Sequence, residues 1–155
     1  MASRFDPEII TSNNECLILV HPEVRTLETL TNEIRQHYTQ EFHISKELSG
    51  RLLSVSPLDR SRISQQWLTD VLVNFTDAPV LCTHPDLLFE PSLALDPFTV
   101  LRNIARIKRL IVLWPGEYAS NVLSYATPSH HHYRTWKITN DLLMHPSLKI
   151  LRLPE

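Results

Sequence analysis

The eight residues 21–28 stand where a phosphate-binding loop would do its chemistry, between an apolar run and a helical pattern. In a loop of the form GxxxxGK[ST], glycines let backbone N–H groups wrap the phosphates, the lysine neutralises them and the hydroxyl holds magnesium. This window has no glycine, Leu27 stands at the lysine position and Glu28 at the hydroxyl position. Arg25 is its only cation, and its two glutamates repel a triphosphate. The residues therefore argue against nucleotide hydrolysis at this loop.

Asp86 is a second candidate, because it follows an apolar segment and a proline. A carboxylate in such a place can hold magnesium or orient a water. An Asp after a proline more often makes a turn or caps a helix. The sequence shows no second magnesium ligand beside Asp86, which favours the turn.

A third candidate is a set of cations in the segment 102–109. Arg102, Arg106 and Arg109 are spaced by four and three residues, so they share one helix face if the helix continues, and Lys108 adds charge nearby. Such a face could sense a phosphate or contact a DNA backbone. It is equally typical of a solvated helix end, where the helix dipole favours cations. The sequence leaves these alternatives open.

Three consecutive histidines at 130–132 suggest a metal site, but adjacent side chains point in different directions on any regular element. We therefore expect no metal there. His130, Tyr133 and Arg134 have a spacing that could line one face of a helical turn and bind an anion or a partner. The alternative, which we favour slightly, is a polar loop with a packed tyrosine.

The elements that must position these residues alternate between apolar strands and amphipathic helices. We expect strands at 16–20, 42–44, 78–82, 110–114, 122–126 and 148–153. We expect helices at 23–38, 46–53 and 139–144, one after Asp59 with Ile63, Trp67, Val71 and Phe75 on one face, and one capped by Asp96 and Pro97. Pro115 and Gly116 should stop the strand at 110–114. This alternation predicts a single α/β domain over residues 1–155, with a mainly parallel sheet flanked by helices.

The composition is that of an ordinary globular protein, with 155 residues, 43% of them hydrophobic, and a net charge of -2. No global basic field draws such a chain to nucleic acid, and its longest apolar run is too short to span a bilayer. Cys16 and Cys82 lie in apolar runs, which is typical of reduced, buried thiols, and the first residues lack an apolar signal core. We expect a cytoplasmic protein without a membrane partner.

Several short pieces of the sequence follow one another in a distinctive order and spacing. They are Leu48-Ser49, Arg51-Leu-Leu53, Leu87-Leu-Phe89, Pro91-Ser-Leu93, Leu95-Asp-Pro97, Leu101, Arg106, Leu110-Ile-Val, Trp114-Pro-Gly116, Leu123, Tyr125-Ala126, Pro128, His130 and Tyr133-Arg134. In these pieces the chain resembles the BrxF family, the small P-loop proteins of type 3 BREX phage-defence systems. The resemblance extends from Leu17 to Trp136.

The resemblance implies a P-loop NTPase-like, AAA-like three-layer α/β fold. It also implies protein partners from a defence locus: a large ATPase, a DNA methyltransferase or an alkaline-phosphatase-like protein. The family's phosphate loop falls on residues 21–28, and its magnesium-holding acidic strand end falls near Thr83, which has no carboxylate. The degenerate nucleotide-binding region is then His21, Pro22, Arg25, Thr26, Leu27, Glu28, Thr83 and Asp86.

We therefore expect a non-catalytic accessory subunit of a phage-defence complex, a pseudo-ATPase without a cofactor that docks on a larger protein. The first alternative is an ATP-binding or ATP-hydrolysing switch that takes magnesium and ATP in an atypical site of Arg25, Asp86 and the cations from Arg106 to Arg109. A weaker alternative is a DNA-contacting adaptor that uses the basic helix. The sequence leaves a homo-oligomer open.

Overall fold

The computed structural model describes residues 15–36, 40–76, 79–144 and 147–153 of the chain. Within them the main sheet has the strand order β2-β3-β4-β1-β7, and every neighbouring pair in this order is parallel. Its strands are β1 (Cys16–His21), β2 (Glu41–His43), β3 (Val80–Thr83), β4 (Leu110–Ala119) and β7 (Leu148–Arg152). The predicted α/β fold with a mostly parallel sheet is confirmed.

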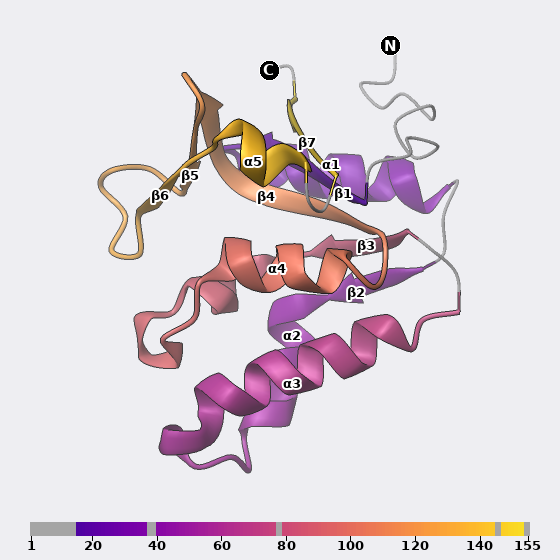
Figure 1. Ribbon diagram of the computed structural model, residues 1–155, viewed down its shortest axis with the longest axis vertical. Coiled ribbons are helices and arrows are strands. Elements are labelled where there is room, and N and C mark those ends of the chain that lie inside the picture. Colours follow the sequence, from indigo (N-terminus) through magenta and orange to yellow (C-terminus); the bar gives the residue numbers. More distant parts are fainter. Residues whose placement is uncertain (1–14, 37–39, 77–78, 145–146, 154–155) are drawn as a thin grey trace.

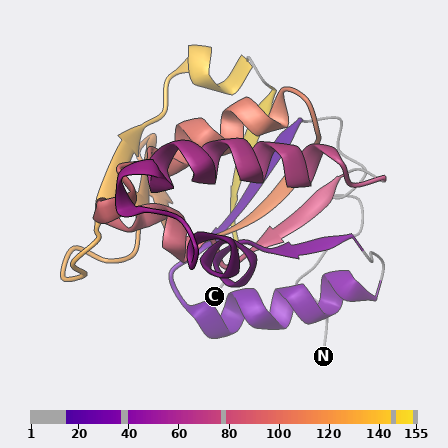
Figure 2. The ribbon, with the colours of Figure 1, turned by 90° about the horizontal axis from the view of Figure 1, so that it is seen from below.

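Helices cover both faces of this sheet (Figures 1 and 2). α1 (Val24–Arg35) packs alone against one face, whereas α3 (Arg60–Val73) and α4 (Pro97–Ala105) lie across the other (Figure 2). The connections contain α2 (Ile44–Leu52), α5 (Asn140–Met144) and the 3₁₀ turns η2 (Pro57–Asp59), η3 (Pro85–Phe89) and η4 (Pro91–Leu93). No described helix is long and apolar enough to cross a membrane.

The continuous apolar run of β1 is explained by burial on both faces. Cys16, Ile18 and Val20 join the larger core beneath α2, α3 and α4, while Leu17 and Leu19 join a smaller core beneath α1. Side chains alternate between the faces of a strand, so a strand in the middle of a covered sheet needs apolar residues at every position. The sequence pattern of residues 16–20 predicted the strand, and the structure places it between β4 and β7.

β4 does not stop at Pro115, and that prediction is wrong. The strand continues to Ala119 and pairs there with β5 (Val122–Tyr125), which in turn pairs with β6 (Arg134–Lys137), both antiparallel. Proline lacks an N–H, but β3 pairs with β4 only as far as Val112. Pro115 therefore lies where the ladder no longer needs its donor on that side. The strand at 134–137 was not predicted.

Two further expectations change in detail. α4 is capped as predicted, with Thr99 N–H donating to the Asp96 carboxylate at 3.2 Å, but it ends at Ala105 and does not continue to Arg109. In α3 the predicted apolar face is only half-buried, and Leu68 and Leu72, one residue further along, lie deepest. The predicted ends of a helix at 37–38 and the start of a strand at 78 lie outside the described residues.

Candidate functional site

The carboxyl edge of the sheet, where the parallel strands end, brings together much of the predicted nucleotide region. β1 leads into α1 on one face, whereas the chain that leaves β4 reaches β7 through α5 on the opposite face. In open α/β sheets, ligands bind at the carboxyl edge where neighbouring connections leave to opposite faces. His21 ends β1 and Thr83 ends β3 at this edge. It is therefore the place where a site would be expected.

His21 closes the end of β1 with a ring that is only 3% exposed. Its Nδ1 accepts the backbone N–H of Glu23 at 2.9 Å, so the neutral ring carries its proton on Nε2. Pro22, between them, has no N–H to offer. The N–H of Glu23 is thus already bonded to the imidazole, and Pro22 has no N–H. Neither of these two positions directs an N–H group at a phosphate. Nε2 itself is buried and has no hydrogen-bond partner among the described residues.

The side chain at the motif's lysine position points into the protein. Leu27 is 6% exposed and packs in the core between α1 and the sheet. Arg25 and Glu28 are exposed on the first turns of α1, and Thr26 is half-buried. A cationic side chain at position 27 would lie on the face of α1 that is buried against the sheet. It could reach solvent only by turning away from that face. The loop therefore cannot supply the motif's lysine without repacking the helix.

A small pocket lies between α1 and the ends of β3 and β4, with Glu28, Thr83 and Asp86 in its walls. The pocket brings together residues from both parts of the predicted nucleotide region, the β1–α1 segment and the end of β3. Its volume is about 20 Å³, whereas one water molecule needs roughly 10–15 Å³ by the same measure. The hydroxyl of Thr83 is buried and has no partner among the described residues. The pocket has room for about one water and is too small for a nucleotide.

Asp86 holds neighbouring elements together. Its Oδ1 accepts a hydrogen bond from the hydroxyl of Tyr125 at 3.0 Å, which ties η3 to the end of β5. Burial, followed by the charge of Asp86 and this hydrogen bond, raises the pKa of Tyr125 above its ordinary range. The Tyr125 ring stacks on Phe89 with the centroids 3.6 Å apart. Asp86 thus lies in the first turn of η3 and accepts a structural hydrogen bond from β5.

Two histidines stack where β2 and β3 end, an arrangement that the sequence analysis missed. The rings of His43 and His84 are parallel within 2°, with centroids 4.0 Å apart. His43 Nδ1 accepts the N–H of Lys46 at the start of α2. His84 adopts a left-handed backbone with φ of 50°, and its carbonyl accepts both the N–H and the hydroxyl of Ser45. Burial, followed by the neighbouring His84, lowers the pKa of His43.

Arg134 is engaged within the fold. Its guanidinium donates to the carbonyl of Leu95 at 2.8 Å and lies 5.1 Å above the ring of Trp136. The indole of Trp136 donates to Asp96 at 3.0 Å. These contacts fasten β6 to the start of α4. These contacts explain the position of the Arg134 side chain without a bound ligand.

The histidine run forms a loop before β6 that folds back on itself. His130 Nδ1 accepts the N–H of His132 at 2.9 Å, and the His130 ring meets Tyr125 edge to face. His132 lies 3.6 Å from the carboxylate of Glu90. Tyr133 is 37% exposed on the wall of a pocket of about 580 Å³ between this loop and η4. His130, Tyr133 and Arg134 thus lie near one another but do not converge on one point through any contact described.

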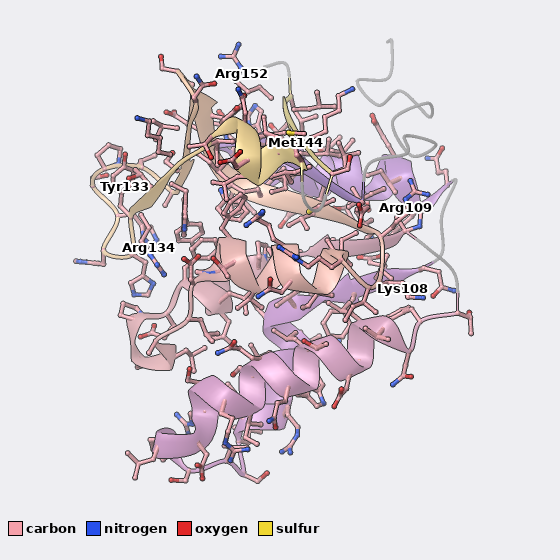
Figure 3. The ribbon with its side chains drawn as sticks, viewed as in Figure 1. Lys108, Arg109, Tyr133, Arg134, Met144 and Arg152 are labelled. Carbon is pink, nitrogen blue, oxygen red and sulfur yellow. The ribbon has the colours of Figure 1, made fainter. Side chains whose placement is uncertain are left out.

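The basic segment lies at the other end of the sheet. Lys108 donates to the carbonyl of Phe75 at 2.5 Å, and the carbonyl of Arg109 accepts the N–H of Val80 where β3 begins. Figure 3 shows Lys108 and Arg109 on one side of the molecule and Tyr133 and Arg134 on the opposite side. Arg102 is half-buried and Arg106 exposed. The structure therefore does not bring Arg109 together with Asp86, which lies beyond the opposite end of β3.

Comparison of the chain with protein-family models, with curated proteins and with solved structures finds no match.

Among the described residues, no three His, Cys, Asp or Glu side chains are placed to hold a metal ion together. In the histidine run at 130–132, Nδ1 of His130 already accepts the N–H of His132. The sequence offered no signal for the His43–His84 stack, because the two residues belong to strands far apart in the chain. Parallel pairing of β2 with β3 brings their ends together.

Proposed function

We propose that this chain is a non-catalytic, P-loop-like accessory protein of a bacterial phage-defence system of the BREX type, and that it acts by binding other proteins. The observation that supports the loss of catalysis is the conformation of the β1–α1 loop. His21 Nδ1 takes the N–H of Glu23, and Leu27 is packed in the core at the position of the motif's lysine. The defence setting rests on the resemblance to the BrxF family.

Three features of the sheet support a P-loop-like origin for this fold. An apolar parallel strand at the centre leads through a short loop into a helix on one face. The loop stands at the carboxyl edge, where the connections of β1 and β4 leave to opposite faces. The end of β3, where the family's magnesium ligand would stand, faces the same small pocket as Glu28. These features support the proposal that the chain has a nucleotide-binding type of fold without its phosphate cradle.

Isothermal calorimetry with magnesium and ATP tests the loss of the nucleotide site. We expect no saturable heat up to about 1 mM ATP. At that concentration, a site with a binding free energy of about −4 kcal/mol is half filled. Tight binding of magnesium and ATP would overturn the proposal. Steady phosphate release that disappears in Asp86→Ala would instead favour the switch alternative. The partner side is tested by co-expression with the large ATPase, the methyltransferase and the phosphatase-like protein of a type 3 BREX locus, where one of them should co-purify.

A further inference from the structure

Arg134 is a half-buried cation that forms no ion pair with any acidic side chain the structure describes. Its guanidinium donates to the carbonyl of Leu95 at 2.8 Å and lies 5.1 Å from the centre of the Trp136 ring. Both of these partners are uncharged. The carboxylate of Asp96 accepts instead from the N–H of Thr99 and the indole of Trp136. The charge of Arg134 is therefore held in place without being neutralised.

The guanidinium is positioned by two separate segments. η4 ends at Ala94, which has a left-handed backbone with φ of 51°, and the next residue supplies the carbonyl that Arg134 binds. Arg134 itself begins β6 and pairs there with Tyr125 of β5. A planar guanidinium presents its N–H groups as a rigid fork. A carboxylate matches such a fork with its two oxygens, so an anchored arginine is prepared to bind one.

A pocket of about 580 Å³ lies beside Arg134, between the histidine loop and η4. Small-molecule pockets in proteins have volumes of roughly 300–1,000 Å³ and mostly apolar walls. Figure 3 shows Arg134 and Tyr133 on the same side of the molecule. Apolar lining comes from Phe89, Pro91 and Leu95. The pocket can therefore hold an apolar group next to the guanidinium.

The loop before β6 adds donors to the wall of this pocket. Tyr133 is 37% exposed, and its hydroxyl has no hydrogen-bond partner among the described residues. The ring of His131 is exposed and likewise makes no contact within the described part of the chain. His132 differs, because its ring lies 3.6 Å from the carboxylate of Glu90. Unused donors on this wall favour a ligand that brings an acceptor group.

The fixed charges in the lining favour a ligand with one negative charge. Arg134 supplies one positive charge, whereas Asp96 is exposed in the same lining and repels anions. A dianionic phosphate would meet this repulsion with its second charge. A carboxylate carries a single charge, which the guanidinium balances.

We infer that this pocket binds a carboxylate attached to an apolar body. Arg134 is the counter-ion, the Tyr133 hydroxyl is a second donor, and the apolar lining holds the body of the ligand. A small organic acid has this chemistry, and so does the C-terminal residue of another chain. The inference goes beyond the proposed accessory role and does not depend on it.

The test is an NMR titration of the full ¹⁵N-labelled chain with phenylacetate at neutral pH. We expect saturable shifts of the Tyr133 amide and the Trp136 indole N–H, with half-saturation at about 1 mM or below. The indole N–H of Trp67, in α3, is the internal control and should not move. Phenylacetamide lacks the charge and should bind at least about tenfold more weakly. Phenyl phosphate, a dianion, should also bind more weakly than phenylacetate.

Two variants test the residues assigned to the site. Arg134→Gln should remove saturable binding, and Arg51→Gln, on an exposed arginine of α2, is the matched control. Because Arg134 also fastens β6 to Leu95, Tyr133→Phe tests the pocket without disturbing that bond. It should weaken phenylacetate binding by about threefold or more through loss of the hydroxyl.

A pair of peptides distinguishes the two sources of the carboxylate. Acetyl-Ala-Phe with a free C-terminal carboxylate is compared with its C-terminal amide. Tighter binding of the free-acid peptide than of phenylacetate assigns the pocket to a chain end, and weaker binding assigns it to a small acid. Either result upholds the inference, provided that the amide binds more weakly than the acid.

Four results would each overturn the inference. They are the absence of saturable shifts up to about 10 mM phenylacetate, equal binding of phenylacetamide, tighter binding of phenyl phosphate, and unchanged binding to the Tyr133→Phe protein. Calorimetry with ATP reports on the β1–α1 loop and is independent of all four. Failure of this pocket and failure of the non-catalytic proposal are therefore distinguishable.

Discussion

The indole nitrogen of Trp114 donates a hydrogen bond to the carbonyl oxygen of Ser124 at 2.8 Å, and the bond passes directly over Gly116. Trp114 is fully buried and packs edge to face against Phe89 and Trp136. The bond therefore anchors the β4–β5 hairpin to the main core. It needs a residue without a side chain at position 116, which gives the Trp-Pro-Gly sequence its structural meaning.

Gly116→Ala should destabilise the protein, because the new Cβ would lie 1.9 Å from the Ser124 carbonyl oxygen. Forced overpacking of this kind costs about 2 kcal/mol of unfolding free energy. Urea unfolding measures the change. Gly50→Ala is the matched control, since a Cβ there meets nothing within 4 Å in the exposed part of α2. It should leave stability unchanged or raise it by up to ~1 kcal/mol. Equal effects of the two substitutions would contradict the steric argument.

Acid should destabilise the protein through His43. The folded-state pKa of His43 lies below its ordinary value of 6.5, chiefly because of burial and then because of His84. Protonation therefore favours the unfolded chain, and stability that is complete above pH 6.5 is lost as the pH falls through and below that value. Urea midpoints measured between pH 7.5 and 5 should show this loss.

His43→Asn should reduce the acid loss, because asparagine can still cap α2 but does not titrate. Glu41 and Lys46 lie close enough to act on His43, the first raising and the second lowering its pKa, so both are kept in this variant. His131→Asn is the control on an exposed histidine. If the two variants show the same acid slope, the stacked pair is not responsible.

Asp86 and Tyr125 should be energetically coupled, because the tyrosine hydroxyl donates to the carboxylate at 3.0 Å. A double-mutant cycle with Asp86→Ala and Tyr125→Phe should give a coupling free energy of about 1 kcal/mol in urea unfolding. A structural acceptor accounts for such coupling, whereas a magnesium ligand would not. Independent effects of the two substitutions would remove the structural role assigned to Asp86.

The two cysteines should resist modification in the folded protein. Burial raises the pKa of Cys16 to about 12 and also raises that of Cys82, so neither forms a thiolate at neutral pH. Iodoacetamide should label both only after urea unfolding, as mass spectrometry can show. Ser120→Cys, in the exposed hairpin turn, supplies a thiol that should react at once. Rapid labelling of Cys16 in the native protein would refute the buried-thiol assignment.

The strands were predictable where burial imposed an apolar run, and less so where pairing alone holds them. Residues 16–20 of β1 and the buried first half of β4 have no polar side chain that could disguise them. β6 has only the four residues Arg134–Lys137 and alternates half-buried with exposed positions. What holds it is its pairing with β5 and the bond from Trp136 to Asp96, forty residues away. Such a contact leaves no local periodic signal.

At the β1–α1 loop, residue types showed which parts of the GxxxxGK[ST] motif are absent, but not how the loop is held in the fold. Leu27 could be identified at the motif's lysine position from spacing alone. The bond from Glu23 to His21 depends on a side-chain rotamer at a strand end, which spacing does not determine. The separation of Arg109 from Asp86 follows from β3 running from one edge of the sheet to the other. Predicting this separation requires knowledge of the direction of β3 in the sheet.

The central place of β1 has a consequence for synthesis of the chain. β1 is the first described element to leave the ribosome, yet both of its partners, β4 and β7, come from the second half of the sequence. Its apolar side chains therefore cannot join β4 until residues 110–115 have been made, and cannot join β7 until residues 148–152 follow. Until then the nascent chain exposes the continuous apolar run 16–20, which is buried in the folded protein. The main sheet is therefore complete only after β7, the last of its described strands, has been made.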